Sequence, residues 1–246
     1  MAGAAAAVLG SALRDGLVIG PAAATVRKPL RFMAGEHPRP GRGSEAAGHA
    51  VLALARTIPA GSQFLVLLSG GASALMAAPA PGITLEEKGR ATATLLRAGA
   101  DIHALNTVRK HISAIKGGRL AVSTPAWCRT LAVSDVVGDA LSVIGSGPTV
   151  ADVSTFADAA DVLQRFGGRS EYPRSVVDHL EAGLRGERSE TPKPGDSRLA
   201  RSTAAVIGGR FDAMRGAEAE ARARGYQVLV IEIGRASCRE RVCQYV

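Results

Sequence analysis

Three segments of the sequence combine glycines, hydroxyls, cations and carboxylates in arrangements suited to binding an anion. The first is Ser69-Gly70-Gly71, which follows the apolar run 63–68 and leads into a short helix that contains Ser73. A buried strand that ends in two glycines and turns into a helix presents backbone N–H groups and the positive helix end to an anion. An ordinary strand-to-helix turn would use the same glycines for geometry alone, so both interpretations stay open. The segment is not a Walker A motif, because no Gly-Lys-Ser/Thr follows at the required spacing.

The second segment, residues 106–121, carries five basic side chains within eleven positions. On a helix, Asn106 and Arg109 share one face, and Lys116 enters a two-glycine turn that can aim it freely. A transferring phosphoryl group needs such cations, because its equatorial oxygens carry the negative charge. A run of charge is more often a solvated face, but the glycine pair and Asn106 favour a site here.

The third segment carries two carboxylates, Asp135 and Asp139. Asp135 follows the predicted strand 130–133, and catalytic carboxylates of α/β folds collect at that end of a strand. Two carboxylates four residues apart can hold Mg²⁺, or one of them can orient or deprotonate an attacking hydroxyl. Capping of the next helix is the structural alternative. For Asp139, helix capping and a functional role have equal weight, whereas a functional role is favoured for Asp135.

Two further residues are candidates for substrate contact. Ser146 opens a turn that contains glycine and proline, and such a turn either lines a phosphate site or serves only as a turn. His37 lies in a proline-rich loop after a predicted strand. A structural role in the loop is favoured for this histidine, and contact with substrate is the alternative.

Strands and helices alternate along the chain, which predicts an α/β fold with a Rossmann-like, mostly parallel sheet, flanking helices and incomplete ends. Apolar runs predict strands at 16–19, 30–34, 63–68, 130–133, 203–207 and 227–231. Helical spacing and helix-forming composition predict helices at 2–13, 44–58, 72–76, 84–97, 101–115, 153–166, 172–184 and 211–224. The order of the strands stays open, but the glycine turn and Asp135 each follow a strand end, where ligands bind in such sheets.

Composition limits the classes of function. The chain has 246 residues, a formal charge of +8 and only 4% aromatic residues. Most of the basic residues are arginine and alanine is abundant, which is typical of a GC-rich genome, and few aromatic rings accompany the cations, which disfavours nucleic acid as a partner. The apolar start has no basic n-region and is interrupted at Arg14-Asp15, so neither a signal peptide nor a membrane span is predicted. A single cysteine outside the last fourteen residues fits a reducing, cytoplasmic location.

Several long motifs resemble the type II glycerate kinase family, also labelled glycerate 2-kinase or hydroxypyruvate reductase. They occur in the order of that family at residues 37–47, 65–88, 95–121 and 134–159. The resemblance extends from about residue 1 to about residue 231. It implies a Rossmann-like larger domain and an ATP- and Mg²⁺-dependent kinase that makes 2-phosphoglycerate from glycerate. The site would lie in a cleft that faces a second domain, called MOFRL.

The resemblance implies that the glycine turn, the basic segment and the aspartate cluster around the substrate. We expect catalytic roles for Asp135, Lys116 and Arg109, and a tentative Mg²⁺ site at Asp135 and Asp139. The residues expected to bind substrate or phosphate are Ser69, Gly70, Gly71, Ser73, Asn106, His37 and Ser146. The expected ligands are ATP, Mg²⁺ and glycerate. The expected assembly is a homodimer, with neither nucleic acid nor membrane as a partner.

The sequence departs from the family at both ends. Family members usually begin upstream with a Gly-Lys-Ala segment whose lysine is thought catalytic, and they carry the MOFRL domain after the region matched here. Residues 233–246 resemble the translation of a sequencing adaptor. We therefore expect residues 1–232 to be a partial N-terminal domain, the tail to be artefactual and this length of chain to be inactive alone. An NAD(P)H-dependent hydroxypyruvate reductase is the alternative function, disfavoured because Gly145-x-Gly147 lacks the third glycine of a dinucleotide fingerprint.

Overall fold

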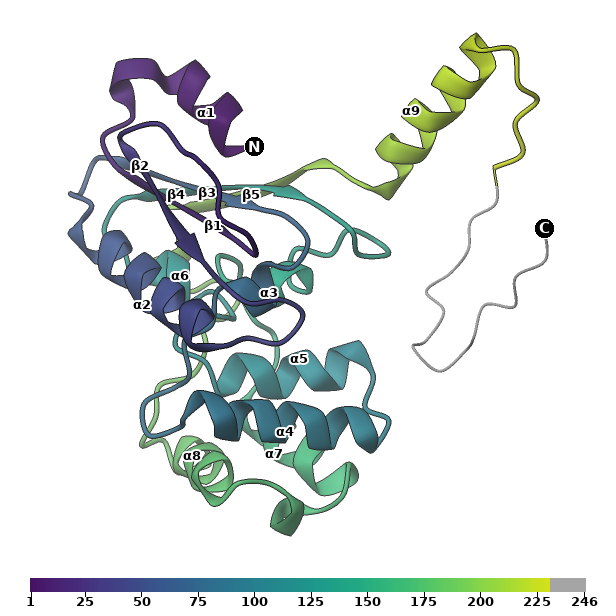
Figure 1. Ribbon diagram of the computed structural model, residues 1–246. Coiled ribbons are helices and arrows are strands. Elements are labelled where there is room, and N and C mark those ends of the chain that lie inside the picture. Colours follow the sequence, from purple (N-terminus) through teal and green to yellow (C-terminus); the bar gives the residue numbers. More distant parts are fainter. Residues whose placement is uncertain (231–246) are drawn as a thin grey trace.

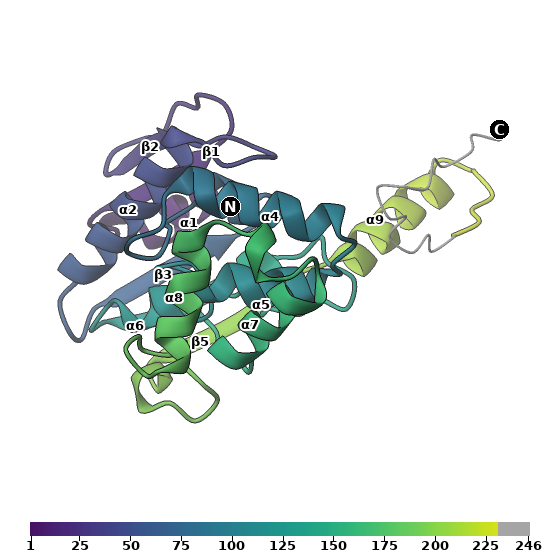
Figure 2. The ribbon, with the colours of Figure 1, turned by 90° about the horizontal axis from the view of Figure 1, so that it is seen from below.

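The computed structural model describes residues 1–230, which form an α/β structure of parallel sheets flanked by helices, as the sequence predicts (Figures 1 and 2). The strands are β1 (Gly16–Gly20), β2 (Leu30–Ala34), β3 (Gln63–Leu68), β4 (Trp127–Val133) and β5 (Ser202–Gly208). The helices are α1 (Ala2–Leu9), α2 (Arg42–Thr57), α3 (Ala72–Leu75), α4 (Leu85–Arg97), α5 (Ile102–His111), α6 (Arg119–Val122), α7 (Phe156–Arg165), α8 (Arg174–Leu184) and α9 (Arg210–Ala223). The suspected adaptor tail at 233–246 lies outside the described residues.

The strands form two sheets rather than one. β1 and β2 pair in parallel, and β3, β4 and β5 form a second parallel sheet with β4 in the middle. Every second residue of β3 points into the core, beginning at Phe64 and ending at Leu68. Because β3 and β4 run in the same direction with Leu68 paired to Ala132, the residues that follow these two strands emerge at one edge of the sheet.

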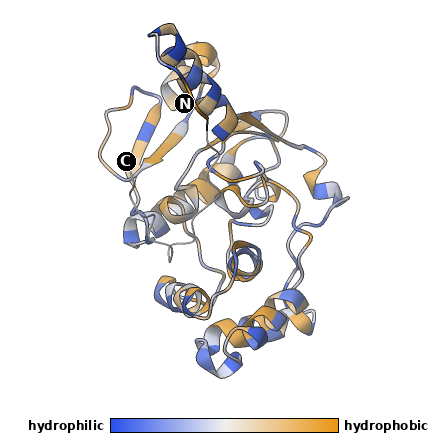
Figure 3. Cartoon of the chain, turned by 90° about the vertical axis from the view of Figure 1, so that its right-hand side faces the viewer, coloured by the Kyte–Doolittle hydropathy of each residue, from blue (hydrophilic) through white to orange (hydrophobic). Residues whose placement is uncertain are grey.

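The helices divide between two hydrophobic cores. The first core lies between the larger sheet and helices α2 and α6. The second core is enclosed by α4, α5, α7 and α8, which pack against one another below the sheet in the view of Figure 1. Colouring by hydropathy shows apolar and polar residues interleaved along the helices, as expected where each helix has one buried face (Figure 3). The helical cluster therefore has a core of its own beside the sheet.

Two predicted elements differ from the structure. The helix expected at 101–115 ends at His111, because the chain then turns and Ser113 forms a bridge with Pro79. This turn carries Lys116 back towards the edge of the sheet. The strand expected at 227–231 is absent from residues 227–230, and Ile231 lies outside the described residues. An apolar run predicts a strand only where a neighbouring strand is available to pair with it.

The loop after β2 caps the first long helix through Glu36. Its carboxylate accepts hydrogen bonds from the backbone N–H groups of Ser44 at 2.8 Å and Gly43 at 3.0 Å. The first N–H groups of a helix have no partner inside the helix, so this carboxylate satisfies two of them. Hydrogen bonds from Ser44, and then from Gly43, lower the pKa of Glu36 to about 2. The segment around His37 thus has a structural task at Glu36.

We expect Glu36→Gln to lower the thermal unfolding temperature at pH 7 by a few degrees. Because the folded-state pKa is lowered from 4.5 to about 2, the stabilisation by the carboxylate is present above pH 4.5 and is lost as the pH falls towards 2. The difference between wild type and variant should shrink over that interval in calorimetry. Glu86→Gln removes an exposed carboxylate in the first turn of α4 and serves as the control. An equal effect of both substitutions would contradict the capping role.

Candidate functional site

The glycine turn between β3 and α3 brings together segments that are far apart in the sequence. A Cβ at Gly70 would lie 2.9 Å from Oδ2 of Asp135, and a Cβ at Gly71 would lie 3.1 Å from Cδ2 of His37. Gly71 also has a φ of 85°, which strongly favours glycine. The two glycines therefore leave room for the side chains of Asp135 and His37. Three segments expected to form one site do meet at this edge of the sheet.

The helix that follows the turn is too short to provide the anion site expected from its dipole. α3 has only four residues, and its N-cap makes no side-chain hydrogen bond. A helix dipole adds up over several turns, so a single turn contributes little of it. The charge at this site must come from side chains instead.

Ser73 of α3 is the centre of a hydrogen-bonded group of side chains. Its Oγ accepts hydrogen bonds from Nζ of Lys116 at 2.6 Å and from a terminal nitrogen of Arg109 at 2.5 Å. It also lies 3.3 Å from Oγ of Ser146, which in turn donates to Oδ1 of Asn106 at 2.9 Å. Because the Ser73 hydroxyl accepts from two cations, its own proton is free to point towards Ser146. The structure thus gathers five of the residues expected to form the site.

Lys116 is held in place from both sides of this group. Its Nζ also donates to the backbone oxygens of Gly145 at 3.0 Å and Ser73 at 3.3 Å. Only 2% of the residue is exposed. Burial, followed by the charges of Arg109 and Lys88, holds the pKa of Lys116 well below its ordinary range. Burial and the neighbouring basic side chains therefore make the charged form of Lys116 costly in free energy.

Lys88 is a further buried lysine, and its charge acts on the group of basic side chains around Ser73. It lies on α4 with 5% of its surface exposed, and burial together with the charge of Arg109 lowers its pKa to about 7, against a smaller opposing effect of Glu45. Burial also lowers the pKa of Arg109. Within residues 1–230, none of the three side chains Lys88, Arg109 and Lys116 forms a salt bridge. In this part of the chain the three basic side chains therefore have no carboxylate within salt-bridge distance.

A signal for Lys88 was present in the sequence. The buried face of α4 consists of Lys88, Ala91 and Leu95, at positions i, i+3 and i+7. A lysine on an otherwise apolar stripe is a buried cation, and buried cations cluster at functional sites.

The two aspartates expected to share Mg²⁺ face different parts of the chain. Asp135 lies beside Gly70, whereas a Cβ at Gly209 would lie 2.9 Å from Oδ2 of Asp139. The described residues contain no group of three or more His, Cys, Asp or Glu side chains that could hold a metal ion. A closed metal site built from protein ligands alone is therefore not formed in this part of the chain.

Other charged residues of the basic segment have structural partners. Nζ of Lys110 lies 3.0 Å from Oδ1 of Asp152, and the aspartate side chain is fully buried. The ring of His111 lies between the backbone oxygen of Thr107 at 2.8 Å and a carboxylate oxygen of Glu190 at 3.1 Å. Both side chains therefore have partners that stabilise the helical cluster.

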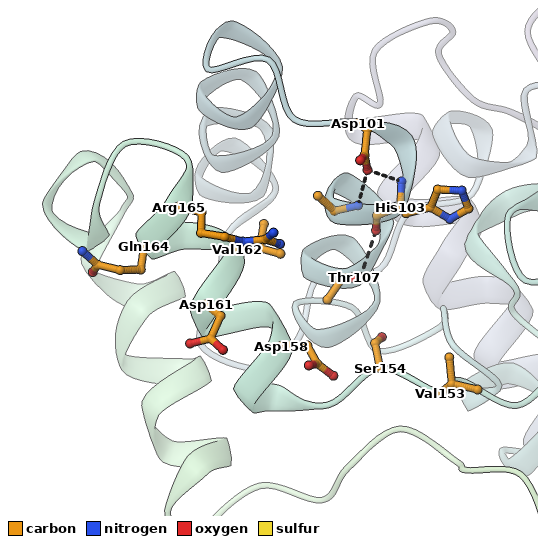
Figure 4. Close-up of a pocket in the computed structure, with 11 residues that line it drawn as sticks. Asp101, His103, Thr107, Val153, Ser154, Asp158, Asp161, Val162, Gln164 and Arg165 are labelled. Atoms are coloured by element: carbon orange, nitrogen blue, oxygen red, sulfur yellow. Dashed lines mark hydrogen bonds between the residues drawn. The ribbon is translucent and has the colours of Figure 1, made fainter.

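A separate cavity of about 690 Å³ lies between the start of α5 and α7 (Figure 4). Its lining includes Asp101, Asp158, Asp161 and Arg165, and none of the residues selected from the sequence. Asp101 caps α5 there by accepting hydrogen bonds from two backbone N–H groups at 2.8 and 2.9 Å. This cavity is distinct from the group of cations around Ser73.

Comparison with known proteins decides the family. The profile of the family described as Domain of unknown function, DUF4147, matches residues 1–181. The chain belongs to this family. The DUF4147 chain is 43% identical over 166 residues to a glycerate 2-kinase of Pyrococcus horikoshii, an alignment that covers 68% of this chain and 38% of the relative. The expected resemblance to type II glycerate kinases is confirmed.

A solved structure shares the fold of the DUF4147 chain. The crystal structure of a glycerate kinase from Thermotoga maritima matches with a TM-score of 0.80 and 36% identity, covering 92% of this chain and 52% of that one. A putative hydroxypyruvate reductase of Agrobacterium vitis is 41% identical over 168 residues, which is 68% of this chain and 37% of that protein. The DUF4147 chain spans between 37% and 49% of the length of the curated relatives it matches.

Within residues 1–230 of the DUF4147 chain, no helix combines the length and the apolar character that crossing a bilayer requires.

Proposed function

We propose that the protein is a glycerate 2-kinase, which transfers a phosphoryl group from ATP to the 2-hydroxyl of glycerate. The observation that carries this proposal is the convergence of Arg109 and Lys116 on Ser73, beside the glycine turn that faces Asp135. Phosphoryl transfer needs positioned positive charge and an oriented nucleophile. The names of relatives with 37–43% identity support the same reaction.

In this proposal the side chains have separate tasks. Arg109 and Lys116 neutralise the charge that develops on the oxygens of the transferring group. The amine of Lys116 is held in position, because it already donates to Ser73 and Gly145. Asp135 orients the 2-hydroxyl of glycerate and accepts its proton. The glycine turn, Ser146 and Asn106 hold the anionic groups of the reactants, and His37 contacts the substrate from the outer side.

Mg²⁺ fits at Asp135 better than at the pair of aspartates. Asp135 offers one exposed carboxylate beside the glycine turn, and Mg²⁺ commonly takes one or two carboxylates together with waters and substrate phosphates. Asp139 lies against Gly209 and would serve only as a second ligand. When bound, the ion neutralises charge on the phosphate oxygens.

The test measures ADP release by a coupled assay with glycerate and ATP. The protein is expressed with any coding sequence that flanks these 246 residues in its gene, because the relatives are longer than the chain. We expect turnover that depends on glycerate and Mg²⁺. The alternative reductase predicts oxidation of NADH by hydroxypyruvate instead. NADH oxidation without ADP release would overturn the kinase proposal.

The remaining expectations are part of the same proposal. A cytoplasmic location fits Cys128, which is a buried free thiol in the described part of the chain. The domain boundary at residue 232 and the homodimer stay predictions. Size-exclusion chromatography with light scattering tests whether the protein is a homodimer.

A further inference from the structure

We propose that Lys88 is a third cationic ligand of the oxyanion group that binds beside Ser73, together with Arg109 and the amide of Asn106. The ligand chemistry is a carboxylate or phosphoryl oxyanion, which glycerate and phosphate each carry. This inference rests on the proposed function, because it names a residue of the same site. It adds a side chain from α4, an element to which no part of the site has been assigned so far.

The hydrogen bonds of the described residues support the assignment. Nζ of Lys88 and Nδ2 of Asn106 are buried, and both lack a hydrogen-bond partner. An unpaired buried donor is costly, so native proteins rarely keep one without a ligand to satisfy it. Asn106 already uses its Oδ1 to accept from Ser146 at 2.9 Å, which fixes the orientation of the amide and leaves its N–H₂ group to donate.

The charges around Lys88 lead to the same ligand. Arg109 of α5 and Lys116 in the turn after it are the nearby cations, and Glu45 of α2 is the carboxylate that acts on Lys88. α8 also packs against α4, and it contributes apolar residues to their common core, such as Val176 and Leu180. One carboxylate leaves this group of basic side chains with unmatched positive charge when they are protonated, and a bound oxyanion would reduce that excess.

Arg109 provides the route by which a ligand reaches Lys88. The arginine is partly exposed, and it donates to Ser73 through only one of its terminal nitrogens. A guanidinium has five N–H donors, so an oxyanion can bind Arg109 from the side of the glycine turn. The amine of Lys88, on a flexible stem, can then reach the same oxygens from the side of α4.

Binding should therefore bring a proton to Lys88. In the protein without an oxyanion the pKa of Lys88 is about 7, so much of the amine is neutral at pH 8. A bound negative charge favours the charged form and raises the pKa. Isothermal titration calorimetry with glycerate, and separately with inorganic phosphate, in buffers of different ionisation enthalpy should reveal uptake of up to about one proton per anion.

Lys88→Met is the decisive variant, because methionine keeps the stem and removes the amine. We expect a protein without ligand that is at least as stable as wild type, since a desolvated amine is removed, and at least a tenfold loss in affinity for the anion. The proton uptake that accompanies binding should decrease at the same time, because Lys88 no longer takes up a proton. Arg90→Met removes one positive charge from the exposed side of the same helix and should change none of these quantities.

Several results would overturn the proposal. If Lys88→Met lowers stability and keeps the wild-type affinity and proton uptake, Lys88 has a structural role. If methionine prevents folding, Lys88→Gln is measured in the same way, and unchanged affinity there has the same meaning.

Two results would support the proposal and also identify the ligand. Loss of phosphate binding alone assigns the site to a phosphoryl group, and loss of glycerate binding alone assigns it to the carboxylate. Because these measurements are of binding, they can succeed even if the protein lacks kinase turnover.

Discussion

Replacing Asp135 with asparagine is expected to lower the rate of phosphoryl transfer about 100-fold or more, with little change in stability. Within residues 1–230 the carboxylate of Asp135 forms no hydrogen bond or ion pair, and the residue is exposed beside Gly70. It therefore contributes little to folding, and its position fits contact with a reactant. General base catalysis is typically worth 10²–10⁴ in rate.

The measurement is kcat for ADP release, accompanied by the unfolding temperature of each variant. Asp161→Asn is the matched control, since Asp161 is an exposed aspartate that lines the cavity of Figure 4 and lies outside the proposed site. Wild-type kcat in the Asp135 variant would remove this residue from the mechanism. A loss of activity in the Asp161 variant instead would move the site to that cavity.

Lys110→Met is expected to reduce the free energy of unfolding by about 3–5 kcal/mol, because it breaks a buried ion pair and leaves a charge unpaired. The partner Asp152 is fully buried, and its carboxylate also accepts from Ser154 at 2.8 Å and Thr191 at 3.1 Å. Burial alone would raise the pKa of Asp152, but the charge of Lys110 and the bonds from Ser154 lower it overall. The ion pair joins α5 to the loop before α7, which contains Asp152. Through Thr191, Asp152 is also bonded to the loop after α8.

Urea unfolding at pH 7 measures this loss, and Arg169→Met provides the comparison. Arg169 pairs with Glu181 at 3.0 Å, but both side chains are more than a third exposed. Such a surface pair is worth less than about 1 kcal/mol. Equal losses in the two variants would show that the Lys110 pair is not the connection described here.

The strands and most helices could be predicted because their signals are local. The run 63–68 and the capping box at Thr84 each determine an element within a few residues, and the observed α4 begins directly after that threonine. The assembly of two sheets and a helical cluster with its own core depends on contacts between distant segments. Hydrophobic periodicity predicts that a face is buried, but it does not predict which element covers that face.

The candidate site was predictable to a similar extent. Glycines at a strand end and an aspartate at the next strand end indicate proximity in a parallel sheet, and the structure places Gly70 beside Asp135. The roles of the basic residues could not be separated in the same way. Lys110 and Lys116 are six positions apart with the same chemistry, yet the first pairs with Asp152 and the second bonds to Ser73. Only the partners, far away in sequence, distinguish them.

The most direct test of the account is a crystal structure of the chain grown with glycerate and inorganic phosphate. We expect the oxygens of one of these anions within hydrogen-bond distance of Arg109 and Lys88, next to Ser73 and on the side of the turn that faces Asp135. An anion bound only in the cavity of α5 and α7, with no ligand near Ser73 at saturating concentration, would contradict the account.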